Sequence, residues 1–437
     1  MTATTSKPRL ALHWQILLAL LLAVVVGSLV GEKGQVFGIT WLAIFGFVGQ
    51  LFLNALKMLI VPLISSSMII GIAGIGRSGA LGRLGGRTLG LYALSGALAV
   101  IVGLTIVNLV SPGIVAGEPA RNVLSLEADQ ERLQQSIAGR GAGDVVQILV
   151  RAIPPNVFEA ASDNAQMLGL IVFSLLFGYF LTRIDEDDAQ PVFRFWKGVF
   201  AVMMHITDLV MRFAPVGVFA LVAQVAARSG FAAAQPLVLF ALCVLGGLLF
   251  HALVTLPLLV RWLGRVSPLP LYRAVSPALL TAFSTASSSA ALPVTMSCLE
   301  ERAGVSNKVT SFVAPLGATI NMNGTALYEC AAVIFIAQAY GIDMSLAQQI
   351  LVVLLALVTS IGVAGIPAAS LVAIAVILQA LHLPAEAMAL LFVFDRPLDM
   401  ARTAINVLGD SAAAVIVARS DGESWVLSDG AKEDAVT

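Results

Sequence analysis

The sequence predicts an all-α polytopic membrane protein that contains two re-entrant helical hairpins. Hydrophobic residues make up 58% of the 437 residues, charged residues only 12%, and the mean hydropathy is +0.93, whereas soluble domains carry about 25% charged residues. Uncharged runs of at least about 20 residues, long enough to cross a bilayer, recur along the chain. Two later segments are equally apolar but are interrupted by serines, or by glycine and proline, which is typical of re-entrant loops.

The apolar runs divide the chain into spans and connecting segments. In order, we expect a cytoplasmic N-terminus (1–9), spans 1 and 2 (10–87), span 3 (88–117), an extramembrane loop (118–151), spans 4 and 5 (152–230), span 6 (231–265), the first hairpin (268–300), span 7 (304–341), the second hairpin (344–385), span 8 (386–419) and a charged tail (420–437). Span 5 is predicted over residues 196–227.

The basic segments give the orientation. Lysine and arginine gather in residues 1–9, 77–87, 183–197 and 261–273, which fall on one side of the membrane when the spans alternate. The positive-inside rule assigns that side, and with it both termini, to the cytoplasm. The first apolar run follows basic residues as a signal sequence does. Because it is longer than the apolar core of a signal sequence and has no clear cleavage site, we expect a spanning helix there.

The two hairpins differ from the spans in their central residues. The first has five hydroxyl side chains among the six residues 284–289, and the second contains Gly362, Gly365 and Pro367. Irregular backbone at membrane depth is tolerated only where protein or a water-filled cavity surrounds it. Two interrupted segments of this kind indicate the binding site of a transporter.

The last span carries a polar stripe. At about 100° per residue, six polar side chains share a stripe about 100° wide, and Arg396 is the only charge off it: Asp395, Asp399, Arg402, Thr403, Asn406 and Asp410. Ionisable residues at membrane depth are costly and usually face a partner or a substrate path. The alternative is a structural ion pair of Arg402 with Asp395 or Asp399, which alone leaves the other polar residues unexplained.

Span 7 contains Asn321-Met322-Asn323-Gly324-Thr325. These residues supply carbonyl oxygens inside an apolar helix, and Gly324 predicts a break in it. Oxygen ligands suit a hard cation such as Na⁺. The alternative is ordinary asparagine-mediated hydrogen bonding between helices.

With these motifs in order, residues 10–418 resemble the dicarboxylate/amino acid:cation symporters, the glutamate/aspartate transporter family. The resemblance is carried by Thr285–Ser289 with Leu292–Thr295, by Asn321–Tyr328, by Gly365–Pro367, and by Asp399–Thr403 with Asn406 and Asp410. It implies eight transmembrane helices, two re-entrant hairpins and a homotrimer of the elevator type. Residues 10–87 and 152–230 would form the scaffold domain, and spans 3 and 6 would belong to the transport domain, which slides across the membrane.

The resemblance also implies roles for individual residues. Asp399 would bind the substrate ammonium, with Thr403 and Asn406 nearby, and Arg402 would bind the side-chain carboxylate with help from Thr325. The α-carboxylate would meet the two hairpin tips, at Ser287, Ser288, Ser289 and Ile366. Physical chemistry agrees, because a planar guanidinium forms paired hydrogen bonds with a carboxylate.

Coupling ions are implied in the same way. One cation site would use Gly317, Asn321, Asn406 and Asp410, and a second would use Thr319, Ser360, Ile361 and Val363. A third, at Tyr92, Ser95 and Asn323, is weakened because asparagine replaces the usual aspartate and Gly96 stands where a hydroxyl is common. Glu329 occupies the position of the proton carrier in proton-coupled relatives, where burial favours its neutral form. The alternative is a neutral structural glutamate bonded to a helix backbone.

The predicted function is therefore a secondary symporter in the bacterial cytoplasmic (inner) membrane that imports glutamate or aspartate with Na⁺, H⁺ or both, without another metal or cofactor. A C4-dicarboxylate:cation symporter would leave Asp399 unpaired, and a neutral amino acid symporter would leave Arg402 without an anion. An intramembrane serine protease would need a base beside the hairpin serines, but His251 and His382 have no recognisable partner motif. A channel would not need fixed charges for both ends of an amino acid. The net charge of −1 does not indicate nucleic-acid binding, and the three cysteines show no metal or disulfide spacing. We therefore expect a transporter, not an enzyme.

Overall fold

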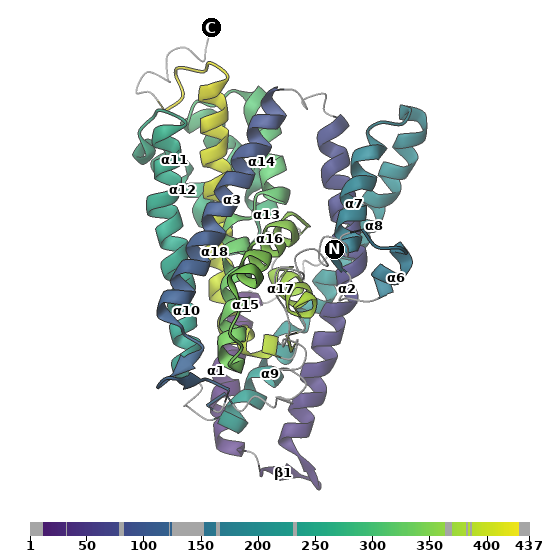
Figure 1. The fold of residues 1–437 in the computed structure, drawn as a ribbon, viewed down its shortest axis with the longest axis vertical. Helices are drawn as coiled ribbons and strands as arrows, with labels where there is room; N and C mark the ends of the chain where they lie inside the picture. The colour runs from purple at the N-terminus through teal and green to yellow at the C-terminus, as the bar shows by residue number, and fades with distance from the viewer. Residues whose placement is uncertain are drawn as a thin grey trace, which may run out of the picture.

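The computed structural model describes residues 12–31, 33–77, 83–121, 123–124, 153–162, 167–229, 234–362, 369–381, 383–384 and 387–427. These residues form a long, helical molecule in which two groups of helices lie side by side (Figure 1). Two short antiparallel strand pairs connect helices: β1 (Gln35–Val36) with β2 (Ile39–Thr40), and β3 (Ile114–Val115) with β4 (Glu118–Pro119).

The first group surrounds α2. It consists of α1 (Leu12–Val30), α2 (Trp41–Arg77), α6 (Val157–Ser162), α7 (Met167–Leu181), α8 (Glu186–Arg212) and α9 (Ala214–Ser229). α2 contacts α7, α8 and α9, and α1 lies along α9. Large apolar side chains on these helices are exposed, as they are on helices that face lipid.

The second group surrounds α15 and α18. It consists of α3 (Arg83–Val110), α10 (Ala234–Phe250), the π-turn η3 (His251–Thr255), α11 (Leu256–Trp262), α12 (Pro268–Thr285), α13 (Ser288–Ser297), the π-turn η4 (Cys298–Arg302), α14 (Asn307–Ile320), α15 (Asn323–Tyr340), α16 (Leu346–Gly362), α17 (Ala369–Ala380) and α18 (Met388–Ser420). Every residue of α15 except Gln338 is buried, so this helix is the centre of the group. α3, α10, α16, α17 and α18 all contact it.

Several helices are long and apolar enough to cross a membrane. Among the described residues five qualify, over 41–74, 84–110, 235–262, 307–340 and 390–420, and a sixth span results if α8 and α9 count as one. α8 and α9 are bent by 52° at Phe213. The span expected over 196–227 is therefore divided in the structure into two helices that meet at this bend. Pro215, in the first turn of α9, has no N–H to donate to Met211, and its ring clashes with that carbonyl group.

A helical hairpin occupies the first serine-rich segment. α12 ends where Ala286 adopts a left-handed conformation (φ 50°, ψ 39°), and α13 begins at the next residues. Ser287 is the N-cap of α13, and its hydroxyl accepts a hydrogen bond from the amide of Ala290. In the second segment α16 and α17 contact each other. The residues that join them, including Gly365–Pro367, lie outside the described residues, as does most of the loop expected at 118–151.

Candidate binding site

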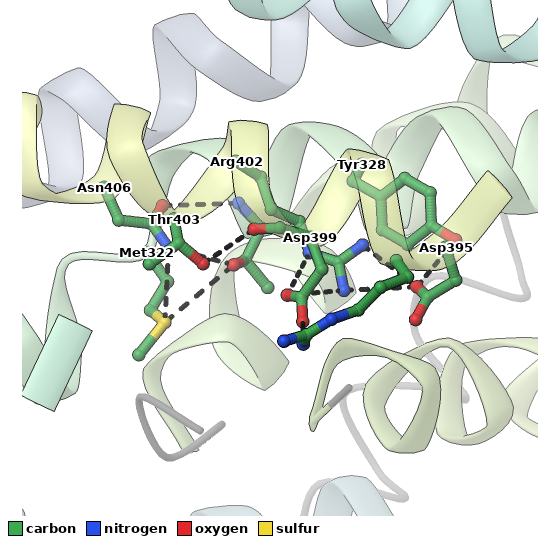
Figure 2. A network of polar contacts seen from close by, with 9 residues as sticks. Met322, Tyr328, Asp395, Asp399, Arg402, Thr403 and Asn406 are labelled. Atoms are coloured by element: carbon green, nitrogen blue, oxygen red, sulfur yellow. Dashed lines mark hydrogen bonds and ion pairs between the residues drawn. The ribbon is translucent and has the colours of Figure 1, made fainter. Parts of the chain in front are cut away.

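The polar stripe of α18 is buried in the second group. All six of its residues are at most 6% exposed. Figure 2 shows Tyr328 beside Arg402 and Asp395, and Met322 beside Thr403 and Asn406. The prediction that they share one face therefore agrees with the structure. Arg396, which lies off the stripe, is also buried, at 7% exposure. Its long side chain reaches Asp399, about one turn further along the helix.

Four charged residues of α18 form a closed cluster, which we call the charge cluster: Asp395, Arg396, Asp399 and Arg402. Arg402 lies 2.9 Å from Asp399 and 3.2 Å from Asp395, and Arg396 lies 3.3 Å from the other Asp399 oxygen. The ring of Tyr328 covers the Arg402 guanidinium at 4.3 Å, and its hydroxyl donates to Asp395. Two positive and two negative charges thus balance within about two turns of helix.

The structural ion pairs that the sequence offered as an alternative are therefore present. They do not involve Thr403, Asn406 or Asp410, whose contacts are different. The hydroxyl of Thr403 donates to the Asp399 carbonyl at 2.7 Å. The other two residues face the break between α14 and α15.

The break falls at Asn321 and Met322, not at Gly324 as predicted. Gly324 lies in the first turn of α15, where a Cβ atom would be 2.6 Å from the Arg402 carbonyl oxygen. Glycine is needed there because α15 and α18 approach each other closely. The side chain of Asn406 serves the start of α15: it accepts from the Gly324 amide at 2.8 Å and donates to the Thr325 hydroxyl at 3.1 Å.

Asp410 meets the end of α14. Its carboxylate accepts a hydrogen bond of 2.8 Å from Asn321. A Cβ atom on Gly317 would lie 2.3 Å from the same carboxylate and 2.8 Å from the Tyr92 hydroxyl. The structure thus brings together Gly317, Asn321 and Asp410, three of the four residues expected at the first cation site. Asn406 is one helical turn from Asp410 on α18.

The third expected site is also assembled, but without a carboxylate. Asn323 donates to the Ser95 hydroxyl. Within the described parts of the chain, the side-chain oxygens of Asn321 and Asn323 are buried and have no hydrogen-bond partner. Both residues line a cavity of about 280 Å³ together with Tyr92, Gly96 and Ser360. Unpaired carbonyl oxygens beside a cavity fit an oxygen-coordinated cation, because a bound ion would satisfy them.

The remaining predicted residues are only partly described. Ser360 is buried and donates to the Leu357 carbonyl, while the half-buried Thr319 donates to Leu316. The side chain of Ile361, and Val363 and Ile366 altogether, lie outside the described residues.

The three serines of the first hairpin differ from one another in exposure. Ser288 is buried, Ser287 is half-buried and Ser289 is exposed. The helix that they begin, α13, contacts α18.

Glu329 is completely buried one turn after Thr325. Its carboxyl oxygen Oε2 lies 2.8 Å from the hydroxyl of Thr359 on α16. Sequence reasoning missed Thr359, and it also missed Tyr328 as the aromatic cover of Arg402. Neither residue interrupts a pattern, because threonine and tyrosine are common in helices packed inside a protein. His251 makes no hydrogen bond to a serine in the described part of the chain, since both its ring nitrogens lack a partner there.

A buried, charge-balanced polar cluster beside a broken helix is typical of secondary transporters of the membrane. The chain belongs to the sodium:dicarboxylate symporter family, whose model matches residues 12–420. The resemblance read from the sequence is thereby confirmed.

Individual relatives are similar over nearly their whole length. The chain is 35% identical to the proton/glutamate-aspartate symporter of Escherichia coli (strain K12), over 94% of this chain and 93% of that protein. It is 36% identical to the proton/sodium-glutamate symport protein of Bacillus caldotenax, over 95% and 96% of the two chains. It is also 33% identical to excitatory amino acid transporter 3 of Mus musculus, over 93% and 85%.

Proposed function

We propose that this protein is a secondary symporter that imports glutamate or aspartate across the bacterial cytoplasmic membrane together with Na⁺, H⁺ or both. The observation that carries the proposal is the charge cluster, which places an anionic and a cationic group three residues apart in a buried site. An acidic amino acid has a matching ammonium and a second carboxylate. The names of the relatives, which include glutamate and aspartate, support the same substrate class.

In the bound state, Asp399 receives the ammonium group and Arg402 the side-chain carboxylate, with Thr325, Thr403 and Asn406 around them. The α-carboxylate meets the tips of the hairpins, at Ser287, Ser288, Ser289 and Ile366. Helix N-termini there offer free N–H groups to an anion. Because Arg402 is already paired with Asp395 and Asp399, the substrate enters by exchange: its carboxylate takes over the guanidinium while its ammonium takes over Asp399.

The coupling ions occupy the oxygen-lined positions. One cation is held by the Gly317 carbonyl with Asn321, Asn406 and Asp410, and a second by Thr319 with Ser360, Ile361 and Val363. The third position, at Tyr92, Ser95 and Asn323, has no carboxylate, so its affinity for a cation is low. Glu329 carries a proton.

The architecture that we propose has eight transmembrane helices, two re-entrant hairpins and a homotrimer with both termini in the cytoplasm. The second group of helices moves as the transport domain, and the first group forms the scaffold. The contact pattern supports this division, because most packing lies within the groups. Between them, α18 touches α9 and α1, α14 touches α2, and α16 and α17 touch α2 and α7.

Uptake by purified protein in proteoliposomes tests the function. Radiolabelled aspartate and glutamate should accumulate when a Na⁺ gradient or a pH gradient is imposed separately, and unlabelled neutral amino acids should not compete. Equilibration of label without accumulation under either gradient would show a channel or facilitator instead of a symporter.

Replacing Asp410 by asparagine should make substrate binding less dependent on Na⁺. Asp410 is the charged ligand of the first proposed cation site, and binding of substrate and cation must be coupled reciprocally. The slope of log Kd for aspartate against log Na⁺ concentration should fall by about one in the variant, the effect of losing one coupled ion. Titration calorimetry at several Na⁺ concentrations measures it. Asp208→Asn, on α8, is the matched control, and an unchanged slope in Asp410→Asn would remove Asp410 from the cation site.

Replacing Glu329 by glutamine should abolish the pH dependence of net uptake but preserve exchange. Glutamine keeps the shape of a neutral carboxyl group but cannot release a proton. Uptake driven by an inward Na⁺ gradient, measured at several external pH values, should become flat, while exchange of internal for external aspartate continues. If the variant keeps the wild-type pH profile, Glu329 has a structural role and the carrier is driven by sodium alone.

A further inference from the structure

The hydroxyl group of Thr359 lies between two oxygen atoms that cannot both receive its proton. Its Oγ1 atom is 2.8 Å from the Leu355 carbonyl oxygen and 2.8 Å from Oε2 of Glu329. A hydroxyl group has one hydrogen to donate and two lone pairs to accept with. Two oxygen atoms at 2.8 Å without a hydrogen between them repel each other, so each contact needs its own proton. The carbonyl group of Leu355 has none to give, and therefore Glu329 donates to Thr359, which donates to Leu355.

The surroundings of Glu329 agree with a neutral carboxyl group. Its second oxygen, Oε1, is buried and has no hydrogen-bond partner among the described residues. The elements packed against α15 carry few other ionisable groups. α16 and α17 have none, and α10 has only Cys243. α3 has Arg83, Arg87 and Tyr92, and β4 brings Glu118 to the far end of α15. α18 contributes Arg402, which is already paired with Asp395 and Asp399. An ionised Glu329 would be a buried charge without a dedicated partner, which is strongly unfavourable.

The proton on Glu329 thus makes a bridge between two helices. Glu329 belongs to α15, the buried centre of the group, whereas Thr359 belongs to α16, the first arm of the second helical hairpin. The next residue, Ser360, lines the cavity beside Asn321 and Asn323. When Glu329 loses this proton, its carboxylate faces a hydroxyl group whose only hydrogen points to the Leu355 carbonyl. The contact between Glu329 and Thr359 can then persist only if that hydrogen turns from Leu355 to Glu329.

We propose that Thr359 is a positioning residue through which protonation of Glu329 fixes α16 against α15, and with it Ser360 beside the cavity, so that substrate affinity rises as the pH falls. The inference rests on the proposed function, because Ser360 belongs to the second proposed cation site, whose occupation is coupled to substrate binding. It adds to that function a specific route: carboxylic acid to hydroxyl to helix backbone. Thr359 does not touch the substrate or the cation.

Aspartate binding to purified protein, measured by titration calorimetry at saturating Na⁺ and at several pH values, tests the route. In wild type the affinity should increase about tenfold between alkaline and acidic pH, the effect of one hydrogen bond of ordinary strength. Repeating the titrations in buffers of different ionisation enthalpy gives the number of protons taken up per aspartate bound. In Thr359→Val, which keeps the side-chain shape, the affinity should change less than about twofold with pH and proton uptake on binding should disappear.

Three further variants make the test selective. Thr359→Ser retains the hydroxyl and should behave like wild type. Thr207→Val is a matched control, because Thr207 is another buried threonine that donates to the carbonyl four residues earlier, on α8; its pH profile should be unchanged. Thr359→Ala also removes the hydroxyl and has a smaller side chain than valine. It should give the same flat pH profile as Thr359→Val, and it replaces that variant if valine disturbs the packing.

The outcomes separate this inference from the proposed function. A wild-type pH profile in both Thr359→Val and Thr359→Ala, with a flat profile in Glu329→Gln, overturns the role of Thr359 and leaves Glu329 as proton carrier. A wild-type profile in Glu329→Gln overturns both, because the proton then binds elsewhere. A flat profile in the Val, Ala and Gln variants, with Thr359→Ser like wild type, supports the complete route.

Discussion

Substitution of Arg402 by alanine should reduce the affinity for aspartate and glutamate by a factor of about 100 to 5,000, the effect of losing about 3–5 kcal/mol at a buried charge pair. Arg402 is the basic residue of the polar stripe and is only 1% exposed. Because the site is closed to solvent, water cannot take over its hydrogen bonds to the substrate carboxylate. Titration calorimetry on the purified variant measures the change. Arg402→Lys should recover only part of the affinity, because an ammonium keeps the charge but not the paired hydrogen bonds.

The same substitution removes the partner of two buried aspartates, and the resulting loss of stability must be separated from the loss of binding. The double variant Asp395→Asn/Arg402→Ala restores charge balance, since Arg396 and Asp399 then remain as a single pair. We expect its thermal unfolding temperature to return toward that of wild type while acidic substrates still bind weakly. Near-wild-type affinity in either Arg402 variant would contradict the assignment of Arg402 to the substrate carboxylate.

Substitution of Asp399 by asparagine should remove the preference for an amino acid over its desamino analogue. A site that is built to bind a charged group rejects an analogue without it by a factor of up to about 10⁴–10⁵. In wild type, succinate should therefore compete with labelled aspartate far more weakly than aspartate itself, and in Asp399→Asn the two should become comparable as aspartate affinity falls.

Asp395→Asn is the matched control for this experiment, because Asp395 belongs to the same charge cluster and also pairs with Arg402. It should preserve the discrimination against succinate. Equal competition by succinate and aspartate in the wild-type protein would instead assign it to C4-dicarboxylate transport.

The polar stripe was predictable because helical periodicity fixes the direction of every Cβ atom on α18. The sequence also offered the pairing of Arg402 with Asp395 or Asp399, but not the pairing of Arg396 with Asp399. Arg396 starts about 100° from Asp395, yet its flexible side chain reaches Asp399 three residues later, as long basic side chains can. Which of two aspartates an arginine contacts depends on rotamers and on Tyr328, which comes from another helix.

The break in the seventh helix shows the opposite limit. Glycine is a weak helix former, so Gly324 was the natural choice from local propensity. In the structure Asn321 (φ −96°, ψ 79°) and Met322 (φ −104°, ψ 58°) leave the helical conformation. Two contacts from α18 accompany that geometry: Asn321 donates to Asp410, and Asn406 accepts from Gly324. Tertiary hydrogen bonds therefore decide where the helix breaks.

The balance of the charge cluster has a consequence for the response to membrane voltage. Arg396 and Arg402 neutralise Asp395 and Asp399, so with Glu329 protonated the binding region contributes one net negative charge, that of Asp410. An acidic amino acid adds another. Two monovalent cations make the loaded carrier electrically neutral, and its crossing is then insensitive to the potential, whereas each unbalanced charge changes the energy of crossing by about 2.3 kcal/mol per 100 mV. In the proposed cycle the empty carrier has released its cations and the Glu329 proton, so that Asp410 and Glu329 leave it negative. Its return, not the delivery of substrate, is then the step that the electric field controls.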